Sequence, residues 1–327
     1  MDDPSLNAVN AEAMSRSLPA PEIVVLGSLN MDLVVRVPRV PGAGETLQAR
    51  GFMTNPGGKG ANQAIACARQ GARVAMVGRV GHDEFGATLR TALETDGIDV
   101  GNVRAAGDTS GIAVIMVDDG GQNRIALVPG ANALLTAADA DCALELGPGQ
   151  LLLLQCEVPM PAIVQAAAIV HQQGGTVVLN AAPICALPEA LLPLVDMLVM
   201  NEVEAAELAG EAVDDVRSAG RAAALLRARG PSVAIVTLGA DGVVVADEQG
   251  CRHFAAIPAQ AIDTTAAGDT FIGALCAARV AGESIDRAIA RGIQAAALCV
   301  TRPGAQMSIP RREELAGMQK VGAPTIL

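Results

Sequence analysis

The chain has 327 residues, and its 23 Lys and Arg against 35 Asp and Glu give a formal net charge of −12. An acidic chain with four Phe and neither Trp nor Tyr is a poor candidate for binding nucleic acid, which requires a basic surface. No apolar run is both long enough and free enough of charge to span a bilayer, so no membrane partner is expected. The length allows two domains, or one large α/β unit with a small appendage.

The cysteines and the N-terminus indicate the compartment. The seven cysteines are scattered and odd in number, and no Cys-x-x-Cys or Cys/His spacing suggests a metal site. Such thiols are typical of a reducing compartment, so we expect a cytoplasmic protein. Residues 1–20 contain Asp2, Asp3 and Glu12 and lack the basic and apolar regions of a secretory signal. We interpret them as a flexible N-terminal tail.

Apolar runs divide the chain into strands and helices. The run 22–27 predicts a buried parallel strand. The β-rich segments 33–39 and 46–53 have no helix between them, so we expect them to form an excursion from the main sheet. The runs 112–117 and 124–128 flank a turn and predict a hairpin. Elsewhere strands alternate with helices, which predicts an α/β fold with a doubly wound, mostly parallel sheet flanked by helices. Those strands are expected at 74–80, 151–154, 177–179, 197–200, 233–237 and 243–246, and helices at 59–70, 84–94, 162–170, from 201, 219–228, 284–300 and, as a short helix, from 310.

Two polar residues follow the first strand. Asn30 and Asp32 are one residue apart, which places them on the same side of an extended segment. Polar groups at the carboxyl end of a strand lie where open α/β sheets bind their ligands. An Asx turn would explain the pair equally well.

The motif Gly-Gly-Lys-Gly-Ala-Asn-Gln-Ala occupies residues 57–64 and opens a helix. It is not a P-loop, because Lys59 is followed by glycine and not by Ser or Thr. The glycine pair would let the backbone approach a ligand, and Asn62 lies in the first turn of the helix, where it can face the same cavity.

A second motif, Asp-Thr-Thr-Ala-Ala-Gly-Asp-Thr-Phe, occupies residues 263–271 and leads into an apolar run that predicts a buried helix. Ala255 and Ile257, upstream of it, are expected in a strand. The small residues 266–268 leave backbone N–H groups uncovered at the positive end of the helix dipole, which makes an anion site. A carboxylate in that site, Asp269, suits phosphoryl transfer in which it takes a proton from an attacking hydroxyl. Alternatively, Asp269 only stabilises the first helical turn.

Polar residues recur where predicted strands end: Asp32, Glu157, Asn201 and Asp269. Since such ends meet at one edge of a parallel sheet, this clustering predicts a single ligand crevice. The Gly-x-Gly-x-x-Gly fingerprint is absent after the first strand, which disfavours a dinucleotide-dependent dehydrogenase.

The two motifs, in this order and spacing, resemble those of the PfkB carbohydrate kinase family, and the resemblance extends from about residue 23 to 312. It implies a ribokinase-like α/β kinase domain over 21–320, with a small β-sheet lid formed by insertions at about 31–56 and 99–130. It also implies ATP-dependent phosphorylation of the 5-hydroxyl of D-ribose, with Mg²⁺, an activating K⁺ and a homodimer formed through the lid.

The resemblance assigns roles to individual residues. Asp269 would be the catalytic base, and the backbone N–H groups of Ala266, Ala267 and Gly268 the anion hole. The positions that match sugar contacts are Asn30, Asp32, Gly58, Lys59, Asn62, Glu157 and Asp269. The positions that match nucleotide contacts are Asn201, near the phosphates and their metal, and Thr237, Leu238, Gly239, Ala240, Asp241, Gly242 and Gly268. The positions that match the surroundings of the K⁺ ion are Asp263, Thr265, Cys299, Arg302, Gly304 and Ser308.

Two departures and several alternatives remain. Ala266 replaces a common glycine, which is tolerable if its Cβ points away from the phosphates. Ile293 stands where a polar nucleotide contact is common. Fructokinase, deoxyribose kinase and nucleoside kinase are alternatives within the family, although a purine substrate usually calls for aromatic stacking. A non-catalytic sugar-binding relative would be expected to lack the base or the anion hole, and both Asp269 and Gly268 are present.

Overall fold

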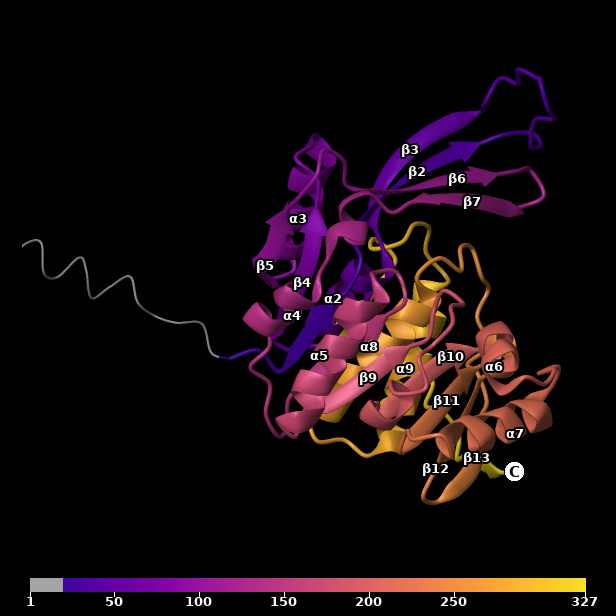
Figure 1. Cartoon of the computed structure of the whole chain (residues 1–327). Coiled ribbons are helices and arrows are strands. Elements are labelled where there is room, and N and C mark those ends of the chain that lie inside the picture. Colours follow the sequence, from indigo (N-terminus) through magenta and orange to yellow (C-terminus); the bar gives the residue numbers. More distant parts are fainter. Residues whose placement is uncertain (1–19) are drawn as a thin grey trace, which may run out of the picture.

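A computed structural model describes residues 20–327, so the tail predicted at 1–20 lies almost entirely outside the described residues. In the described part, ten strands form one sheet in the order β14-β13-β12-β11-β10-β9-β8-β1-β4-β5 (Figure 1). Pairing is parallel from β11 to β5, and β12, β13 and β14 add an antiparallel edge. The predicted α/β fold with a mostly parallel sheet is confirmed.

The bounds of the elements follow the predicted alternation closely. The strands of the large sheet are β1 Ile23–Leu26, β4 Val74–Val80, β5 Asp99–Ala105, β8 Leu151–Gln155, β9 Thr176–Asn180, β10 Met197–Asn201, β11 Val233–Thr237, β12 Val243–Asp247, β13 Gly250–Phe254 and β14 Thr325–Ile326. The α-helices are α2 Lys59–Arg69, α3 Glu84–Thr95, α4 Ala137–Ala143, α5 Met160–Gln172, α6 Glu202–Ala209, α7 Val216–Arg227, α8 Ala267–Val280 and α9 Ile285–Cys299. None of the helices within residues 20–327 has the length and apolar character needed to cross a bilayer.

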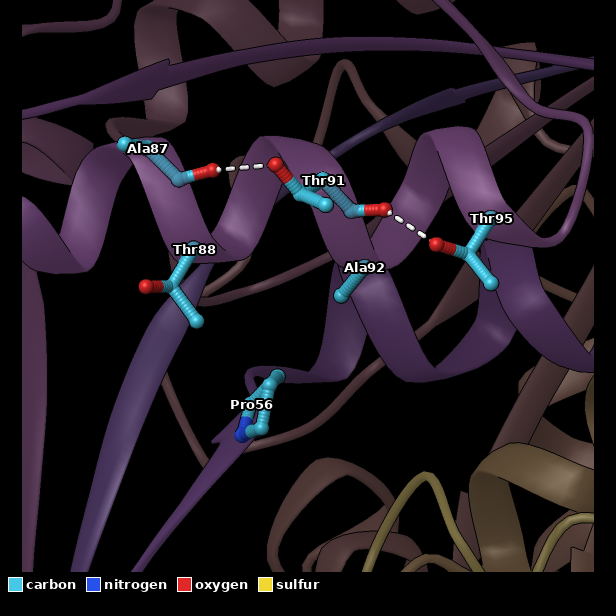
Figure 2. Close-up of a pocket in the computed structure, with 6 residues that line it drawn as sticks. All are labelled: Pro56, Ala87, Thr88, Thr91, Ala92 and Thr95. Atoms are coloured by element: carbon cyan, nitrogen blue, oxygen red, sulfur yellow. Dashed lines mark hydrogen bonds between the residues drawn. The ribbon is translucent and has the colours of Figure 1, made fainter.

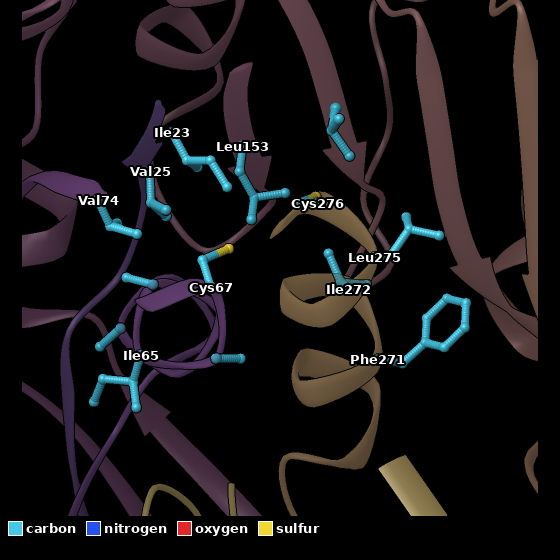
Figure 3. Close-up of a cluster of buried hydrophobic side chains, with 14 of the residues drawn as sticks. Ile23, Val25, Ile65, Cys67, Val74, Leu153, Phe271, Ile272, Leu275 and Cys276 are labelled. Atoms are coloured by element: carbon cyan, nitrogen blue, oxygen red, sulfur yellow. The ribbon is translucent and has the colours of Figure 1, made fainter. Parts of the chain in front are cut away.

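Helices cover both faces of the large sheet, which explains why the central strand β1 is apolar at every position. Along β1, Ile23 and Val25 point into one apolar cluster, and Val24 and Leu26 point into another. The first cluster includes residues of α2, α8 and α9, and the second includes residues of α5 and α7. Figure 3 shows side chains of α2 and α8 meeting Ile23, Val25 and Leu153 in the first cluster. The two helices that carry the sequence motifs therefore lie on the same face.

A separate four-stranded sheet, here called the lid sheet, has the order β3-β2-β6-β7. Its strands are β2 Asn30–Arg36, β3 Gly51–Gly57, β6 Gly111–Val117 and β7 Asn123–Val128. It projects from the main body beyond the end of the large sheet (Figure 1). The motif at 57–64, which begins α2, comes directly after β3. The lid sheet is therefore joined directly to α2.

The structure differs from the sequence-based expectations in several places. The strand expected at 33–39 is β2, Asn30–Arg36, and the strand expected at 46–53 is β3, Gly51–Gly57, so residues 37–39 and 46–50 lie outside any strand. Residues 99–105 form β5, which pairs with β4 in the large sheet, so this part of the predicted lid insertion belongs to the main body. Ala255 and Ile257 follow the end of β13 and lie outside any strand. The helix expected from 310 is a 3₁₀ turn, Arg312–Leu315. For β5, pairing with β4 and not the local sequence decides which sheet the segment joins.

Candidate active site

Asp269 lies in the first turn of α8 and is nearly buried, with 8% of its surface exposed. The helix is preceded by Ala266, which adopts the left-handed conformation with φ 59° and ψ 10°. It is the only non-glycine residue between 20 and 327 with a positive φ. This bend ends the preceding loop and begins the helix at Ala267, so that the N–H groups of its first turn and Asp269 share one end of α8. In this structure the Ala267 N–H donates to the backbone oxygen of Thr264 at 3.3 Å.

Both carboxylate oxygens of Asp269 accept hydrogen bonds from α2. Asn62 Nδ2 donates to Oδ2 at 3.0 Å, and Gln63 Nε2 donates to Oδ1 at 2.9 Å. The two helices approach closely because Gly273 lacks a side chain: a Cβ there would lie 2.3 Å from Cβ of Ala66. The sequence motifs at 57–64 and 263–271 therefore meet in one site.

Asn30 and Asp32 lie on the same face of β2, within the lid sheet. Asn30 Oδ1 accepts a hydrogen bond from Asn132 Nδ2 at 2.8 Å, and Asn132 also binds both backbone groups of Leu29, so the amide of Asn30 is held in place. The carboxylate of Asp32 accepts no hydrogen bond from any residue that the structure describes. Gly57 of β3 makes room for it, since a Cβ there would lie 2.4 Å from Asp32 Oδ2.

The pKa of Asp32 is raised to about 7. Burial is the main cause, and the negative charges of Glu157 and Asp269 add to it. An acid that is buried, unpaired and close to two other carboxylates is typical of a ligand-binding site, where the ligand supplies the missing hydrogen bonds.

Glu157 and Lys59 complete this side of the site. Glu157 Oε2 accepts hydrogen bonds from Ser28 Oγ at 2.5 Å and from the backbone N–H of Lys59 at 3.1 Å. Burial lowers the pKa of the Lys59 ammonium, but the carboxylates of Asp269, Glu157 and Glu204 outweigh burial and raise it. One lysine therefore stands as the counter-charge to a group of acids.

Gly58 has a structural reason to be glycine. It precedes α2 with φ 91°, a conformation that L side chains rarely adopt, and a Cβ there would lie 2.7 Å from the backbone nitrogen of Asn30. Its predicted contact with the sugar thus remains a prediction, while its role in bringing α2 against β2 is visible in the structure.

A cavity of about 550 Å³ opens beside the N-terminus of α8. Ala267 and Gly268 line it, together with four of the six residues of the predicted nucleotide loop: Thr237, Gly239, Ala240 and Gly242. The remaining two differ: Leu238 packs against the core, and the backbone oxygen of Asp241 meets His253 Nε2 at 2.6 Å. Ile293, Ala296 and Ala297 of α9, with Val300 just after it, form an apolar wall. A pocket of this size and character suits a nucleobase and its ribose.

Asn201 caps the N-terminus of α6, as its Oδ1 accepts from the backbone N–H of Glu204 at 2.8 Å. The Glu204 side chain accepts in return from the Asn201 N–H at 2.9 Å, which completes a capping box. Burial raises the pKa of Glu204, which the charge of Lys59 opposes only partly. Asn201 is thus rigidly placed at the edge of the acidic group, with its Nδ2 still available.

The loop before α8 is tied to the C-terminal tail by Asp263. Its Oδ1 accepts from the backbone N–H of Thr265 and its Oδ2 from that of Gly304, both at 2.9 Å. Cys299 Sγ lies 3.1 Å from Ser308 Oγ and 3.8 Å from the backbone oxygen of Thr265. The Arg302 side chain pairs with Glu314 at 2.6 Å, so only its backbone is available to an ion at this place.

The oxygen-rich character of this region fits a monovalent cation better than a transition metal. It offers one carboxylate, one hydroxyl and several backbone carbonyls, which are ligands that hard cations accept. Within residues 20–327 no group of three or more His, Cys, Asp and Glu side chains has the arrangement of a metal site.

A second hollow, of about 410 Å³, lies apart from these residues, where β3 passes α3. Figure 2 shows Pro56 opposite the helix residues that line it. The hydroxyl groups of Thr91 and Thr95 are bound to the backbone oxygens of Ala87 and Thr91 in their own helix. Its lining carries no charged side chain, so it offers no cation to a phosphate.

Four residues of the site were not foreseen from the sequence: Ser28, Gln63, Asn132 and Glu204. Gln63 stands inside the first motif, and Glu204 stands three residues after Asn201, which is the spacing of a capping box. Those two could have been found from their positions. Nothing in the local sequence marks Ser28 or Asn132, because their partners come from distant parts of the chain.

A doubly wound α/β fold, with an acid at a helix N-terminus between a nucleotide-sized cavity and a group of buried polar side chains, defines the class as a small-molecule kinase. The sequence profile of the pfkB family carbohydrate kinases matches residues 20–312. The chain is 41% identical to the ribokinase of Haemophilus influenzae over 294 residues, covering 89% of this chain and 96% of that protein.

Two solved structures extend the comparison. The ribokinase of Thermotoga maritima superposes with a TM-score of 0.82 and 36% identity over 90% of this chain and 98% of that one. The ribokinase of Arabidopsis thaliana, solved with ribose and ATP, gives a TM-score of 0.83 and 34% identity over 91% and 98%. The chain belongs to the PfkB family of carbohydrate kinases.

Proposed function

We propose that this protein transfers the γ-phosphoryl group of ATP to the 5-hydroxyl of D-ribose, giving D-ribose 5-phosphate and ADP. Relatives with the name ribokinase match at 34–41% identity over most of their length, and one of them was solved with ribose and ATP. The observation that carries the proposal is Asp269, a nearly buried carboxylate held at the N-terminus of α8 beside a cavity large enough for a nucleotide.

In the proposed reaction, the sugar lies between Asp269 and the lid sheet. Asp269 takes the proton of the 5-hydroxyl while the hydroxyl oxygen attacks the γ-phosphorus and the bond to the β-phosphate oxygen breaks. The backbone N–H groups of Ala266, Ala267 and Gly268 would stabilise the negative charge on the transferred group, aided by the helix dipole. The proton and the phosphoryl group thus leave their original partners in one step.

Sugar recognition is assigned to the polar crevice. Asp32, unpaired within the described protein, would accept hydrogen bonds from ribose hydroxyls, and Asn30 would donate beside it. Lys59, Asn62, Gly58 and Glu157 would contact the remaining hydroxyls from the start of α2 and the end of β8. Closing the lid sheet over the sugar would exclude water from the reaction.

The nucleotide would occupy the cavity beside α8, with its base against the apolar wall of α9 and its phosphates between Asn201 and Gly268. Mg²⁺ would enter as part of the substrate, bound chiefly by phosphate oxygens and water. We assign K⁺ to the Asp263 region, with Ser308 at its edge and backbone carbonyls of Thr265, Cys299, Arg302 and Gly304 as further ligands. Its effect would be to fix the loop that carries the anion hole.

We further propose a kinase domain over 21–320 that carries the lid sheet, dimerisation through that sheet, and a cytoplasmic location. The six cysteines that the structure describes are free thiols, which fits a reducing compartment.

The test is a coupled assay of ADP formation with ribose, deoxyribose, fructose and adenosine at equal concentrations. Ribose should give the highest kcat/KM, and the product should carry phosphate on O5 in its ³¹P-coupled NMR spectrum. A higher kcat/KM for fructose or adenosine would replace the proposed substrate by another of the family, and no ADP formation with any sugar would point to a non-catalytic relative.

A further inference from the structure

A row of buried side-chain amides leads from the large sheet to Asp269. Asn180, at the end of β9, donates from Nδ2 to the backbone oxygen of Val199 at 3.1 Å. Its Oδ1 accepts from Gln63 Nε2 at 3.0 Å, and the same Nε2 donates to Asp269 Oδ1 at 2.9 Å. Gln63 is fully buried, and Asn180 is 5% exposed. Neither side chain is accessible to a substrate.

The acceptors at the two ends of this row, the Val199 carbonyl and the Asp269 carboxylate, determine how each amide is oriented. The Val199 carbonyl can only accept a hydrogen bond, so Asn180 must turn its NH₂ group toward Val199 and its oxygen toward Gln63. Gln63 must then donate one hydrogen to Asn180, which leaves its second hydrogen for Asp269. Gln155 Nε2 donates to Gln63 Oε1 at 2.7 Å, which agrees with this orientation of the Gln63 amide. The row therefore presents a donor, and not an acceptor, to the Asp269 carboxylate.

This matters because Asp269 lies in an acidic neighbourhood. The carboxylates of Asp32 and Glu204 and the thiol of Cys299 lie close enough for the negative charge of Asp269 to act on them. The Lys59 ammonium is the positive group that acts on it. Hydrogen bonds to the ionised form favour that form, and Asp269 receives one from Gln63 and one from Asn62.

We propose that Gln63 and Asn180 are positioning residues that keep Asp269 ionised and hold its carboxylate in one orientation. The inference rests on the proposed function, in which Asp269 is the base. Asn62 is set apart from this role, since it also stands among the predicted sugar contacts. A base that lost this support would carry a proton over a wider pH range and would be free to rotate, and both changes reduce the rate of proton removal.

The experiment measures kcat against pH for wild type, Gln63→Met and Asn180→Leu, at saturating ribose and ATP. Saturation is needed because Asp32 titrates near pH 7 and would otherwise affect the profile through ribose binding. The decline of kcat at low pH is here called the acid limb. In Gln63→Met the acid limb should move upward by about one pH unit, and kcat at pH 7 should fall about tenfold or more. Asn180→Leu should shift the acid limb in the same direction by a smaller amount. Gln63 remains in this variant, but its amide no longer donates to Asn180 and is not held in one orientation. The KM for ribose should stay within about threefold of wild type in both.

Gln70→Met is the matched control. Gln70 lies just after α2, is 2% exposed and donates from Nε2 to the backbone oxygen of Pro310 at 3.1 Å, far from the row. Its loss should lower the melting temperature as much as the loss of Gln63 while leaving the acid limb in place. If Gln63→Met does not fold, Gln63→Glu keeps the shape of the side chain and should show the larger upward shift, because it adds a carboxylate beside Asp269.

The outcomes separate the two proposals. A folded Gln63→Met protein with the acid limb of wild type would overturn the positioning role. Turnover that persists in Asp269→Asn would instead overturn the assignment of the base, whatever the Gln63 variants do.

Discussion

Asn62 and Asp269 stand 207 positions apart in the sequence and meet through a hydrogen bond of 3.0 Å between Nδ2 and Oδ2. This bond joins the first residues of the two helices that carry the family motifs. Because both helices pack on the same face of the sheet, the orientation of the Asp269 carboxylate depends on how α2 and α8 pack against each other. Changes at this contact therefore test both the chemistry and the fold.

Asp269→Asn should reduce kcat by at least about 10²-fold, because an amide cannot take the proton from the sugar hydroxyl. The fold and ribose binding should be nearly unchanged, which circular dichroism and calorimetric titration with ribose would check. Asp108→Asn, at an exposed loop position, is the control and should behave as wild type. Turnover within threefold of wild type in Asp269→Asn would exclude this residue as the base.

Asp32→Asn should weaken ribose binding and yet stabilise the protein at alkaline pH. The folded-state pKa of Asp32 is about 7, above its ordinary value of 3.8, so folding favours the protonated form. Its ionisation therefore destabilises the fold as pH rises from about 4 to 7, by up to about 4 kcal/mol. At pH 8 the variant should melt at a higher temperature than wild type. The difference between the two melting temperatures should shrink as the pH falls toward 4.

The same variant should bind ribose about ten- to a hundredfold less tightly, since about 1–3 kcal/mol of hydrogen bonding would be lost. In wild type, the KM for ribose should fall as pH rises through about 7, where Asp32 becomes the better acceptor. If Asp32→Asn left the KM for ribose unchanged and weakened ATP binding, Asp32 would belong to the nucleotide pocket.

Ala266→Gly should stabilise the protein by about 1 kcal/mol, because Ala266 has φ 59° and glycine adopts this conformation without a steric penalty. The backbone N–H remains, so kcat should stay within about twofold. Ala267→Gly is the control: it lies in ordinary helix and should lower stability by about 0.5–1 kcal/mol. Denaturant unfolding measures both, and a less stable Ala266→Gly protein would contradict the strain at this position.

The protein should be a dimer in light scattering at micromolar concentration, because the lid sheet leaves an apolar surface uncovered. Ile125 is 54% exposed, Leu127 50% and Met53 42%, and the strand register places these three side chains on one face of the lid sheet. Apolar patches of this kind usually mark an interface. Ile125→Glu should give monomers. Asp119→Glu, a conservative change at the adjacent turn, should leave the dimer intact. A wild-type monomer at this concentration would count against dimerisation through the lid sheet.

Turnover should be faster in potassium than in sodium or Tris at fixed ionic strength. Asp263 ties Thr265 to Gly304, so an ion bound among these oxygens would hold the loop before the anion hole in place. Asp263→Ala should abolish the difference between the salts. Equal rates in all three salts would exclude the ion, and a potassium response that survives in Asp263→Ala would locate it elsewhere.

The sequence by itself determined the class of fold and the identity of the two motifs. Alternating apolar runs and helical segments predict a parallel sheet, and the strand 74–80 was located to the residue, because a strand covered on both faces is mostly apolar. The motif at 263–271 also marked Asp269, since small residues and an acid at a helix start form a local pattern. These features depend on near neighbours in the chain.

The tertiary structure alone decided which polar residues meet. The contacts of Gln63 with Asn180 and Asp269 span 117 and 206 residues, and Asn132 reaches Asn30 across 102. Likewise, β5 joins the large sheet through its pairing with β4, and the pKa of Asp32 rises through burial under distant strands. Hydrogen bonding and desolvation act through space, and residues far apart in the sequence come within their range only when the sheet and its helices have packed.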